Sequence, residues 1–408
     1  MQSNNDQKFD VVLYGATGFT GRQTAEYFQQ HAPAGLRFAI AGRNQNKLEA
    51  LHKELGLPES VGVIAADSAD AQAIDAMVAR TRVLLTTAGP YTLYGEHLVR
   101  ACAEQGVHYV DITGETAFIR DMIDRYAKAA EKSAAKLVPL CGFDSVPADL
   151  GAYLAQKRLR DQHQTGTVSA RGYYSIGGGF NGGTFFSGLT MFETGAHERM
   201  RDVGLLLPEA ARGVAPPADN ESARYEADVD SWVAPFVMGR INTRVVHRSA
   251  ALAAAFAAPY GAAFGYGESL KMGGRWNPVP AVAMASGMQA FEALGTIGAV
   301  RNVLKMLGPA PGAGPSDSAI ENGFYQIEVV AAGENGTRVR TTIADERDPG
   351  NRATVQFVCE AAFALAGDLA ILPGGAERVG FLTPATAFGD VLVDRLIAGG
   401  TTIQSEDL

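Results

Sequence analysis

The feature that most constrains this chain is a glycine-rich turn between a short apolar run and a helical segment. Residues 9–15, FDVVLYG, have the composition of a buried parallel strand, and residues 15–21 follow with a GxxGxxG spacing. Residues 18–31 have a helical pattern, and a second apolar run covers residues 36–41. This order of strand, glycine turn, helix and strand predicts the opening βαβ unit of a dinucleotide-binding Rossmann domain.

Each glycine of the turn has a specific role in this prediction. Gly15 allows the tight turn, Gly18 lets the backbone touch a pyrophosphate, and Gly21 lets the helix pack closely on the strand. The pyrophosphate then lies at a helix N-terminus, where free N–H groups and the helix dipole favour an anion. The alternative is an ordinary glycine-rich turn, against which the flanking strands and helix argue.

The end of the second predicted strand selects the cofactor. NAD-specific domains place an acid there for the ribose 2′-hydroxyl, whereas this chain has AGRN at residues 41–44 and no acid before Glu49. The guanidinium of Arg43 suits a 2′-phosphate, so we expect NADP. The alternative is that Arg43 caps the strand or pairs with a surface acid.

Two later strand ends complete the predicted cofactor site. Asp67 follows the third strand, where it meets the adenine edge or else caps the helix that starts near Asp70. The fourth strand ends in Ala88-Gly89-Pro90-Tyr91, at the sheet edge where the nicotinamide half is expected. Tyr91 faces the nicotinamide ring or packs against a second domain.

Strand and helix patterns alternate up to about residue 145, which predicts a doubly wound parallel sheet. Two alternating runs at 325–332 and 337–345 are joined by Glu-Asn-Gly, a hairpin signal. We therefore expect an α/β protein with a Rossmann domain over 1–145 and an α+β domain with an antiparallel sheet over 146–350. Residues 351–408 are expected to form helices that pack back on the body, with a loose tail from residue 399.

Hydride transfer often needs a proton donor near the acceptor atom. Acids and a tyrosine at the predicted sheet edge are the candidates: Tyr91, Asp111, Glu115 and Asp144. Each has a structural alternative, because Asp111 and Asp144 suit loop amides and Glu115 suits a helix start. Tyr153 and Lys157 match a YxxxK spacing, but no serine stands at the usual distance before them.

Composition excludes several other classes. The formal net charge is −9 and no basic stripe is present, so we expect no nucleic-acid partner. Cys102, Cys141 and Cys359 are far apart, and the histidines show no ligand spacing, so we expect neither a disulfide framework nor a metal. The first ten residues are polar, and we expect a cytoplasmic protein.

One region of unusual composition lies at 249–291. It contains two stretches, 249–267 and 276–291, that are rich in Ala, Gly and Pro. Neither stretch contains a charged residue. They predict a buried helical layer, a homodimer surface or a patch that rests peripherally on a membrane.

Longer strings identify a family resemblance. GATGFTGR, AGPYTLYGEHLVRACAEQGVHYVDITGE, CGFDSVPADLG and FLTPATAFGDVLVDRL together resemble the saccharopine dehydrogenase-like oxidoreductases, and among them the trans-acting enoyl reductases. The resemblance implies an NADP-binding Rossmann domain and reduction of a C=C bond in a lipid or polyketide chain. It also implies relatives at membranes or lipid droplets, and it adds Thr17, Phe19 and Thr20 to the cofactor residues.

The resulting prediction is an NADP-dependent reductase with a hydrophobic acyl substrate. The first alternative is a reductase of C=N or C=O in a small metabolite, although no arginine cluster for a polycarboxylate is evident. The others are a non-catalytic NADP-sensing protein and a lipid-bound scaffold without reductase activity.

Overall fold

The computed structural model describes residues 8–178, 182–213, 216–307 and 315–408. The chain forms two compact units, the first made of residues up to Phe143 together with Asn351–Leu396. The second consists of Asp144–Gly350 and Ile397–Leu408. Residues 351–408, expected to pack back on the body as one segment, are therefore divided between the two units. Most of them, Asn351–Leu396, belong to the Rossmann unit.

The first unit is built on a seven-stranded sheet with the order β13-β6-β5-β4-β1-β2-β3. Every pairing in it is parallel, which confirms the predicted Rossmann-type sheet. Its strands are β1 (Phe9–Tyr14), β2 (Phe38–Gly42), β3 (Gly62–Ala65), β4 (Thr81–Thr86), β5 (His108–Asp111), β6 (Lys136–Val138) and β13 (Gly380–Phe381). Its helices are α1 (Phe19–His31), α2 (Gln45–Glu54), α3 (Ala71–Val78), α4 (Tyr91–Tyr94), α5 (Glu96–Gln105), α6 (Thr116–Ser133), α14 (Thr354–Gly367), α15 (Pro384–Phe388) and α16 (Asp390–Ala398).

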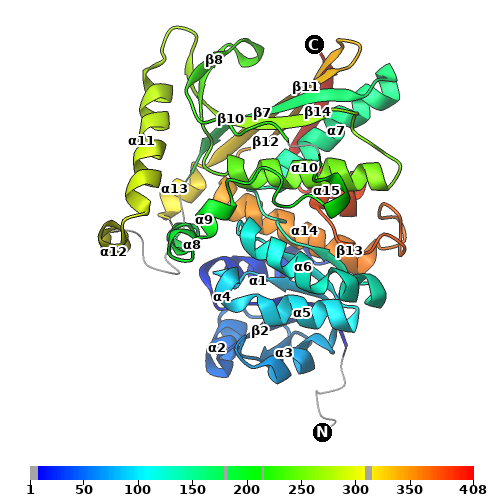
Figure 1. Ribbon diagram of the computed structural model, residues 1–408. Helices are drawn as coiled ribbons and strands as arrows, with labels where there is room; N and C mark the ends of the chain where they lie inside the picture. Colours follow the sequence, from blue (N-terminus) through cyan, green and yellow to red (C-terminus); the bar gives the residue numbers. More distant parts are fainter. Residues whose placement is uncertain (1–7, 179–181, 214–215, 308–314) are drawn as a thin grey trace. The chain divides into compact units, whose positions relative to one another are not determined.

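The returning segment completes the core of this unit (Figure 1). Phe363 of α14 packs on Phe28 of α1 with ring centroids 4.7 Å apart. The Tyr27 hydroxyl donates a hydrogen bond to Glu360 Oε1 at 3.0 Å. Helix α14 is buried along nearly all its length, as its run of Val, Phe and Ala requires.

The second unit is built on a mixed seven-stranded sheet with the order β14-β12-β11-β7-β10-β9-β8. The strands are β7 (Thr167–Gly177), β8 (Arg224–Glu226), β9 (Ser231–Ala234), β10 (Gly265–Gly274), β11 (Phe324–Gly333), β12 (Arg338–Asp345) and β14 (Thr402–Asp407). The antiparallel pair β11–β12 confirms the predicted hairpin, and Gly336 in its turn has a φ of +85°. Among the strand pairs of this sheet that the structure describes, β10 and β7 are parallel and the others are antiparallel.

The expectation of a loose C-terminal tail is wrong. Residues Thr402–Asp407 form β14, which pairs antiparallel with β12 from Ala344↔Thr402 to Val339↔Asp407. Arg158 of helix α7 (Val146–His163) also donates to Asp407 Oδ1 at 2.7 Å. Because these partners lie far away in sequence, the local pattern of the tail did not reveal them.

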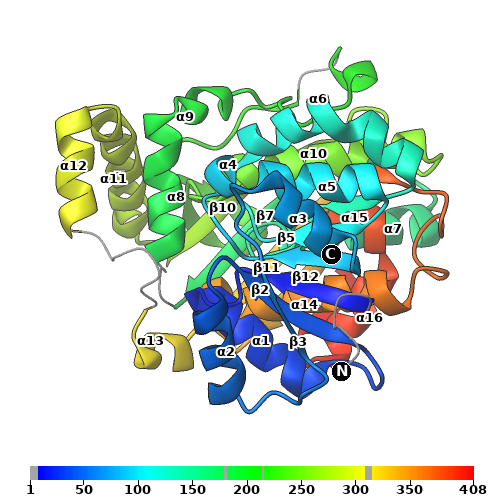
Figure 2. The same cartoon turned by 90° about the horizontal axis from the view of Figure 1, so that it is seen from below.

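The helices of the second unit are α7 (Val146–His163), α8 (Gly182–Glu193), α9 (Ala196–Arg199), α10 (Gly239–Ala255), α11 (Val279–Gly295), α12 (Gly298–Leu307) and α13 (Asp317–Glu321). Helix α7 packs on β11 and β12, while α11 packs on β9 and β10. Figure 2 shows α8, α11 and α12 as neighbours at one side of this unit.

The region 249–291 has two different environments. Residues 249–267, all of which the structure describes, keep their large apolar side chains buried or half-buried. The second stretch forms the start of α11 and exposes apolar side chains, with Trp276 at 89% and Val279 at 68% exposure. Within residues 249–291, the exposed large apolar side chains therefore belong to α11 and the turn before it, and Val303 and Met306 of the following α12 are also exposed.

Candidate functional site

The glycine turn of the first unit has the geometry of a phosphate-binding loop. Gly15 follows β1 with a φ of +87°, and its N–H donates to the Ala41 carbonyl at 2.9 Å. A Cβ at Gly21 would lie 2.1 Å from the Gly15 carbonyl oxygen, so only glycine allows α1 to approach the strand this closely. The sequence motif therefore produces the strand-turn-helix junction that it predicts.

The entrance of α1 is open to a ligand. Gly18 is its N-cap and supplies no side-chain hydrogen bond, which leaves N–H groups of the first turn for an anion. A Cβ at Gly18 would meet only the Gly15 carbonyl oxygen, at 3.3 Å, so the outer side of the turn is free. Thr17 is exposed, and Phe19 and Thr20 are half-exposed beside it. These residues fit a pyrophosphate.

Arg43 stands at the carboxyl end of β2, next to this loop in the sheet. Its side chain is exposed, and none of the described carboxylates forms an ion pair with it. The neighbouring Asn44 caps α2 by accepting from the Lys47 N–H at 3.0 Å. A guanidinium at this position that no described carboxylate occupies fits the 2′-phosphate of NADP.

Asp67 has a local structural contact. Its Oδ1 accepts a hydrogen bond from the Ala69 N–H at 3.0 Å, while Asp70 is the residue that caps α3. The alternative that Asp67 caps this helix is therefore wrong. Its exposed carboxylate lies beyond the end of β3, and contact with adenine stays a prediction.

The loop Ala88-Gly89-Pro90-Tyr91 leads from β4 into α4. The Tyr91 ring is buried, and its hydroxyl donates to the Thr86 carbonyl at 3.0 Å and accepts from the Ile112 N–H at 3.4 Å. Burial raises the pKa of Tyr91 well above its usual value, and the nearby Asp111 adds to this. The hydroxyl therefore holds two strand ends together, and its predicted role as proton donor gains no support from this geometry.

Glu115 caps the short helix α4. Its Oε1 accepts from the Tyr91 N–H and its Oε2 from the Thr92 N–H, both at 2.8 Å. The Thr92 hydroxyl donates to the same Oε2 at 2.5 Å. Glu115 thus acts on α4 across the loop, rather than on the helix that follows it in sequence.

Asp111 joins the ends of two strands. Its Oδ1 accepts from the N–H groups of Thr113 at 3.0 Å and Leu140 at 2.9 Å, and its Oδ2 accepts from the Tyr109 hydroxyl at 2.6 Å. Burial raises the pKa of Asp111 to about 6, although these hydrogen bonds oppose the shift. The structural alternative of loop-amide binding accounts for these contacts.

Asp144 differs from the other candidates. It is half-buried at the start of the second unit, and no described residue forms a hydrogen bond or ion pair with its carboxyl group. Burial raises its pKa to about 7, where a carboxyl group can hold and release a proton. Of the predicted catalytic residues, Asp144 is therefore the one whose carboxyl group is suited to donate a proton.

The residues of the YxxxK pattern, Tyr153 and Lys157, lie on α7.

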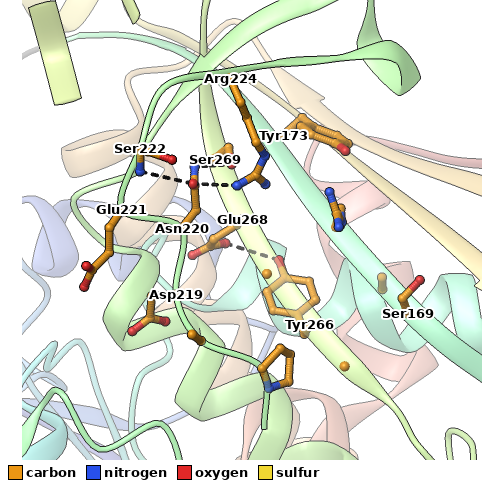
Figure 3. A pocket seen from close by; sticks show the side chains of 16 residues that line it. Ser169, Tyr173, Asp219, Asn220, Glu221, Ser222, Arg224, Tyr266, Glu268 and Ser269 are labelled. Carbon is orange, nitrogen blue, oxygen red and sulfur yellow. Dashed lines mark hydrogen bonds between the residues drawn. The ribbon is translucent and has the colours of Figure 1, made fainter. Parts of the chain in front are cut away.

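The second unit contains two adjoining cavities. The first, about 600 Å³, has a mixed lining with many polar side chains from β7, β10, β8 and the loop before β8, including Asn220, Arg224 and Ser269 (Figure 3). The second, about 770 Å³, is lined mainly by apolar atoms, among them Phe236 and Met288. Both volumes fall in the range of small-molecule sites, about 300–1,000 Å³.

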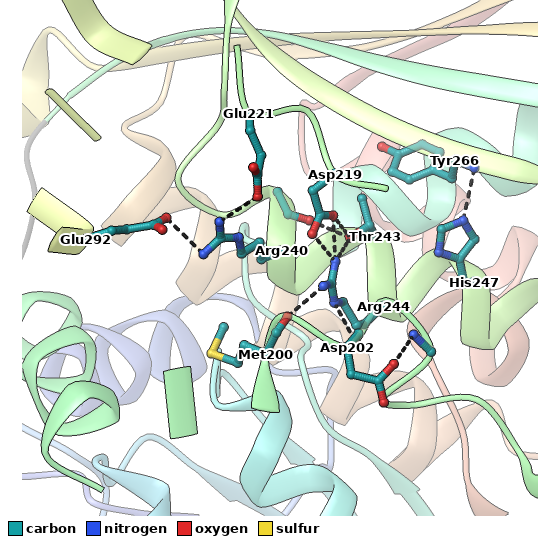
Figure 4. Close-up of polar contacts among 12 residues, drawn as sticks. Met200, Asp202, Asp219, Glu221, Arg240, Thr243, Arg244, His247, Tyr266 and Glu292 are labelled. Carbon is teal, nitrogen blue, oxygen red and sulfur yellow. Dashed lines mark hydrogen bonds and ion pairs between the residues drawn. The ribbon is translucent and has the colours of Figure 1, made fainter. Parts of the chain in front are cut away.

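Two arginines near the larger cavity, Arg240 and Arg244, are already paired with carboxylates (Figure 4). Arg240 binds Glu221 at 3.1 Å and Glu292 at 2.9 Å. Arg244 is fully buried, and its Nη1 donates to both oxygens of Asp219 at 2.6 and 2.7 Å. These arginines therefore stabilise the walls and are not set out to receive a polycarboxylate.

Residues of the second unit were missed by the sequence analysis. Tyr174, Asn242, Tyr266 and Glu268 form a buried polar cluster beside the larger cavity. The signal available was Tyr266 and Glu268, two residues apart and so on one face of a strand. A polar pair on the inner face of a strand indicates a site, but its tyrosine and asparagine partners come from other elements.

Comparison with known proteins agrees with this geometry. Residues 11–138 match the model of the saccharopine dehydrogenase NADP binding domain. Over its whole length the fold is similar to saccharopine dehydrogenase (L-Glu forming) from Saccharomyces cerevisiae, with a TM-score of 0.55, 12% identity and coverage of 98% of this chain and 100% of that one. The first unit is an NADP-binding domain, and the protein is an NADP-dependent oxidoreductase with a saccharopine dehydrogenase fold.

Sequence relatives define the family more narrowly. The trans-acting enoyl reductase of Mycobacterium bovis is 34% identical over 98% of both chains, and that of Mycobacterium ulcerans is 32% identical over 100% of both. A further relative, from Mycobacterium tuberculosis, is 36% identical over 98% of both chains. The chain belongs to the trans-acting enoyl reductase family. Among the described residues, no helix has the length and apolar character to cross a membrane.

Proposed function

We propose that this enzyme uses NADPH to reduce a C=C bond conjugated to the carbonyl group of a long, apolar acyl or polyketide chain. The observation that carries the proposal is the cavity of about 770 Å³, whose lining is mainly apolar and whose lining residue Arg240 is paired with Glu221 and Glu292. The names of its relatives, trans-acting enoyl reductases, support the same reaction.

The reaction needs a hydride from the cofactor and one proton, so few side chains of the protein take part in it. When bound, NADPH supplies a hydride to the β-carbon of the enoyl group, and a proton completes the α-carbon. Asp144 is our candidate donor of that proton, since its carboxyl group has no partner among the described residues and burial raises its pKa to about 7. Gly15, Gly18, Gly21 and Arg43 would hold the cofactor.

The apolar cavity also predicts the breadth of substrate use. Burial of a chain yields about 25 cal/mol per Å², but an apolar wall separates neighbouring chain lengths by only ~1–3 kcal/mol. We therefore expect several chain lengths to be reduced at comparable kcat/KM.

The test is NADPH oxidation with a panel of enoyl thioesters of increasing length, compared with saccharopine and small cyclic imines. Turnover of the thioesters, with the saturated product found by mass spectrometry, is the expected result. Turnover confined to the amino-acid or imine substrates would refute the proposal in favour of a small-metabolite reductase. NADPH that binds but is oxidised with no substrate of either kind would favour an NADP-sensing protein.

We propose further that the exposed apolar residues of α11 and α12 rest on a lipid surface, from which an apolar substrate is delivered. Trp276 in the turn before α11 and Val279 at the start of α11 are exposed, and Met306 of α12 is 83% exposed. Side chains of this kind are costly to leave in water and enter the boundary between lipid headgroups and acyl chains. A homodimer through the same face is the competing outcome.

A further inference from the structure

Glu268 occupies an unusual place in the second unit. It lies on β10, is only 5% exposed, and lines both the smaller cavity (Figure 3) and the larger, mainly apolar cavity. A carboxyl group between two cavities, one of them apolar, needs partners that compensate for the loss of water.

The partners present do not satisfy this group completely. The Tyr266 hydroxyl donates to Glu268 Oε2 at 3.2 Å. The Tyr174 hydroxyl and the Asn242 side chain lower the pKa of Glu268, and Asn242 Oδ1 accepts from the Ser145 hydroxyl at 3.2 Å. The Tyr174 hydroxyl, Asn242 Nδ2 and Glu268 Oε1 nevertheless complete no hydrogen bond of ordinary geometry with a described residue. These three atoms are buried polar groups that a ligand or a water molecule would satisfy.

Charges around the cluster favour a neutral Glu268. Burial dominates and raises its pKa to about 8, and Asp219 on the loop before β8 raises it further. Arg244 of α10 is engaged with Asp219. His247 of the same helix accepts from the Tyr266 N–H at 3.0 Å, and burial lowers its pKa to about 4, so it is uncharged at neutral pH. A neutral carboxyl group carries an O–H that can be donated.

The apolar cavity beside Glu268 suits a hydrocarbon chain. Its walls include Met191 and Phe192 of α8, Phe236 of the loop after β9, and Met288 of α11. Gly287 of α11 also lines it, and a Cβ there would meet no atom within 4 Å. A ligand that fills this space and also satisfies Glu268 must combine an apolar body with a hydrogen-bond acceptor at one end.

We infer that the cavity of the second unit binds the acyl chain and that the Glu268 carboxyl group donates a hydrogen bond to the carbonyl oxygen of that chain. This inference rests on the proposed function and deepens it, since it assigns Glu268 as a substrate-binding residue. The proposed hydrogen bond requires a carbonyl oxygen on the substrate. The site should therefore bind an acyl thioester more tightly than a chain of equal length that lacks the carbonyl group.

The experiment uses two unreactive ligands, the saturated dodecanoyl thioester of N-acetylcysteamine and the S-dodecyl thioether, which lacks only the carbonyl oxygen. Calorimetric titration gives their affinities for wild type, Glu268→Gln and Glu268→Leu at pH 7. A neutral hydrogen bond corresponds to a preference of about three- to tenfold for the thioester. We expect this preference in wild type and in Glu268→Gln, whose amide also donates, and its loss in Glu268→Leu.

The pH dependence gives a second readout. As pH rises through about 8, ionisation of Glu268 removes the donated proton, so the thioester preference of wild type should disappear by pH 9.5 on our prediction. Glu268→Gln has no such proton to lose and should keep its preference over the same range. Thermal melting of each variant checks that it is folded.

A cavity-filling variant tests the location of the chain. Gly287→Leu should weaken both ligands at least tenfold, since its side chain fills the space that they need. Ala290→Leu is the matched control, because Ala290 is exposed on the same helix and does not line the cavity. Unchanged binding to Gly287→Leu overturns the cavity assignment.

Equal affinity of wild type for the two ligands, or a thioester preference that persists in Glu268→Leu, overturns the role of Glu268. These titrations contain neither NADPH nor an alkene. Tight, Glu268-dependent binding without any NADPH oxidation would therefore refute the proposed reduction while it supports this binding site.

Discussion

Arg43 provides the sharpest test of how this protein selects its cofactor. The change is Arg43→Ala, and the measurement is the ratio of the dissociation constants of NADH and NADPH, obtained by fluorescence titration. A guanidinium–phosphate contact contributes about 1.5–3 kcal/mol, or about ten- to a hundredfold in affinity. Arg43 is exposed, and solvent screening places the expected loss of NADPH affinity near tenfold.

The structure predicts that this change leaves the fold intact. No described carboxylate pairs with Arg43, so its removal leaves no buried charge and should alter the free energy of unfolding by less than about 0.5 kcal/mol. NADH has no 2′-phosphate, and its affinity should stay nearly constant. The effect is therefore expected in NADPH binding alone.

Arg37→Ala is the matched control. Arg37 immediately precedes β2 and pairs with Asp10 at 3.6 Å, so it stands at the opposite end of the strand that places Arg43. Its removal should leave the NADH to NADPH ratio unchanged. Wild type that binds the two cofactors equally, or an Arg43→Ala protein with the wild-type ratio, would refute the reasoning.

Three further changes test other parts of the molecule. Glu115→Ala leaves the buried Tyr91 N–H without its acceptor and should lower the free energy of unfolding by about 1–3 kcal/mol in urea titrations; an unchanged midpoint would contradict the capping role. If Asp144 donates the proton, kcat for enoyl reduction should fall as pH rises through about 7, and Asp144→Asn should remove this pH dependence while NADPH binding is kept; a mutant with the wild-type profile would eliminate Asp144. Trp276→Glu should abolish co-sedimentation of the protein with phosphatidylcholine vesicles. If the wild-type protein does not bind vesicles, and forms a dimer that Trp276→Glu dissociates, the face is a subunit contact instead.

The cofactor half of this protein was predictable because its determinants are local. Gly15 needs its positive φ, Gly21 needs to lack a Cβ, and Arg43 ends a strand, and each requirement involves neighbours in one βαβ unit. Such short-range patterns appear directly in the sequence as glycine spacing and alternation of apolar runs. The hairpin of β11 and β12 was predictable for the same reason, since a few turn residues set its register.

The roles of the acids depended on contacts that no local pattern contains. Glu115 lies next to a helix start in sequence, yet its carboxylate caps α4, 23 and 24 residues earlier. Asp111 joins β5 to the residue after β6, whereas Asp144 has no partner at all among the described residues. Only the packing of separate loops distinguishes a structural carboxylate from one that is available for chemistry.

By itself, the sequence determined the parallel Rossmann sheet, the phosphate-binding turn and the absence of an acid beside Arg43, because these follow from residue type and spacing within about 35 positions. Tertiary structure alone decided that α14 completes the first unit and that the C-terminal residues form β14. It also brought Glu268 of β10 together with Tyr174 of β7 and Asn242 of α10. The physical reason is that long-range pairing depends on which buried surfaces and backbone groups remain unsatisfied once the local elements have formed.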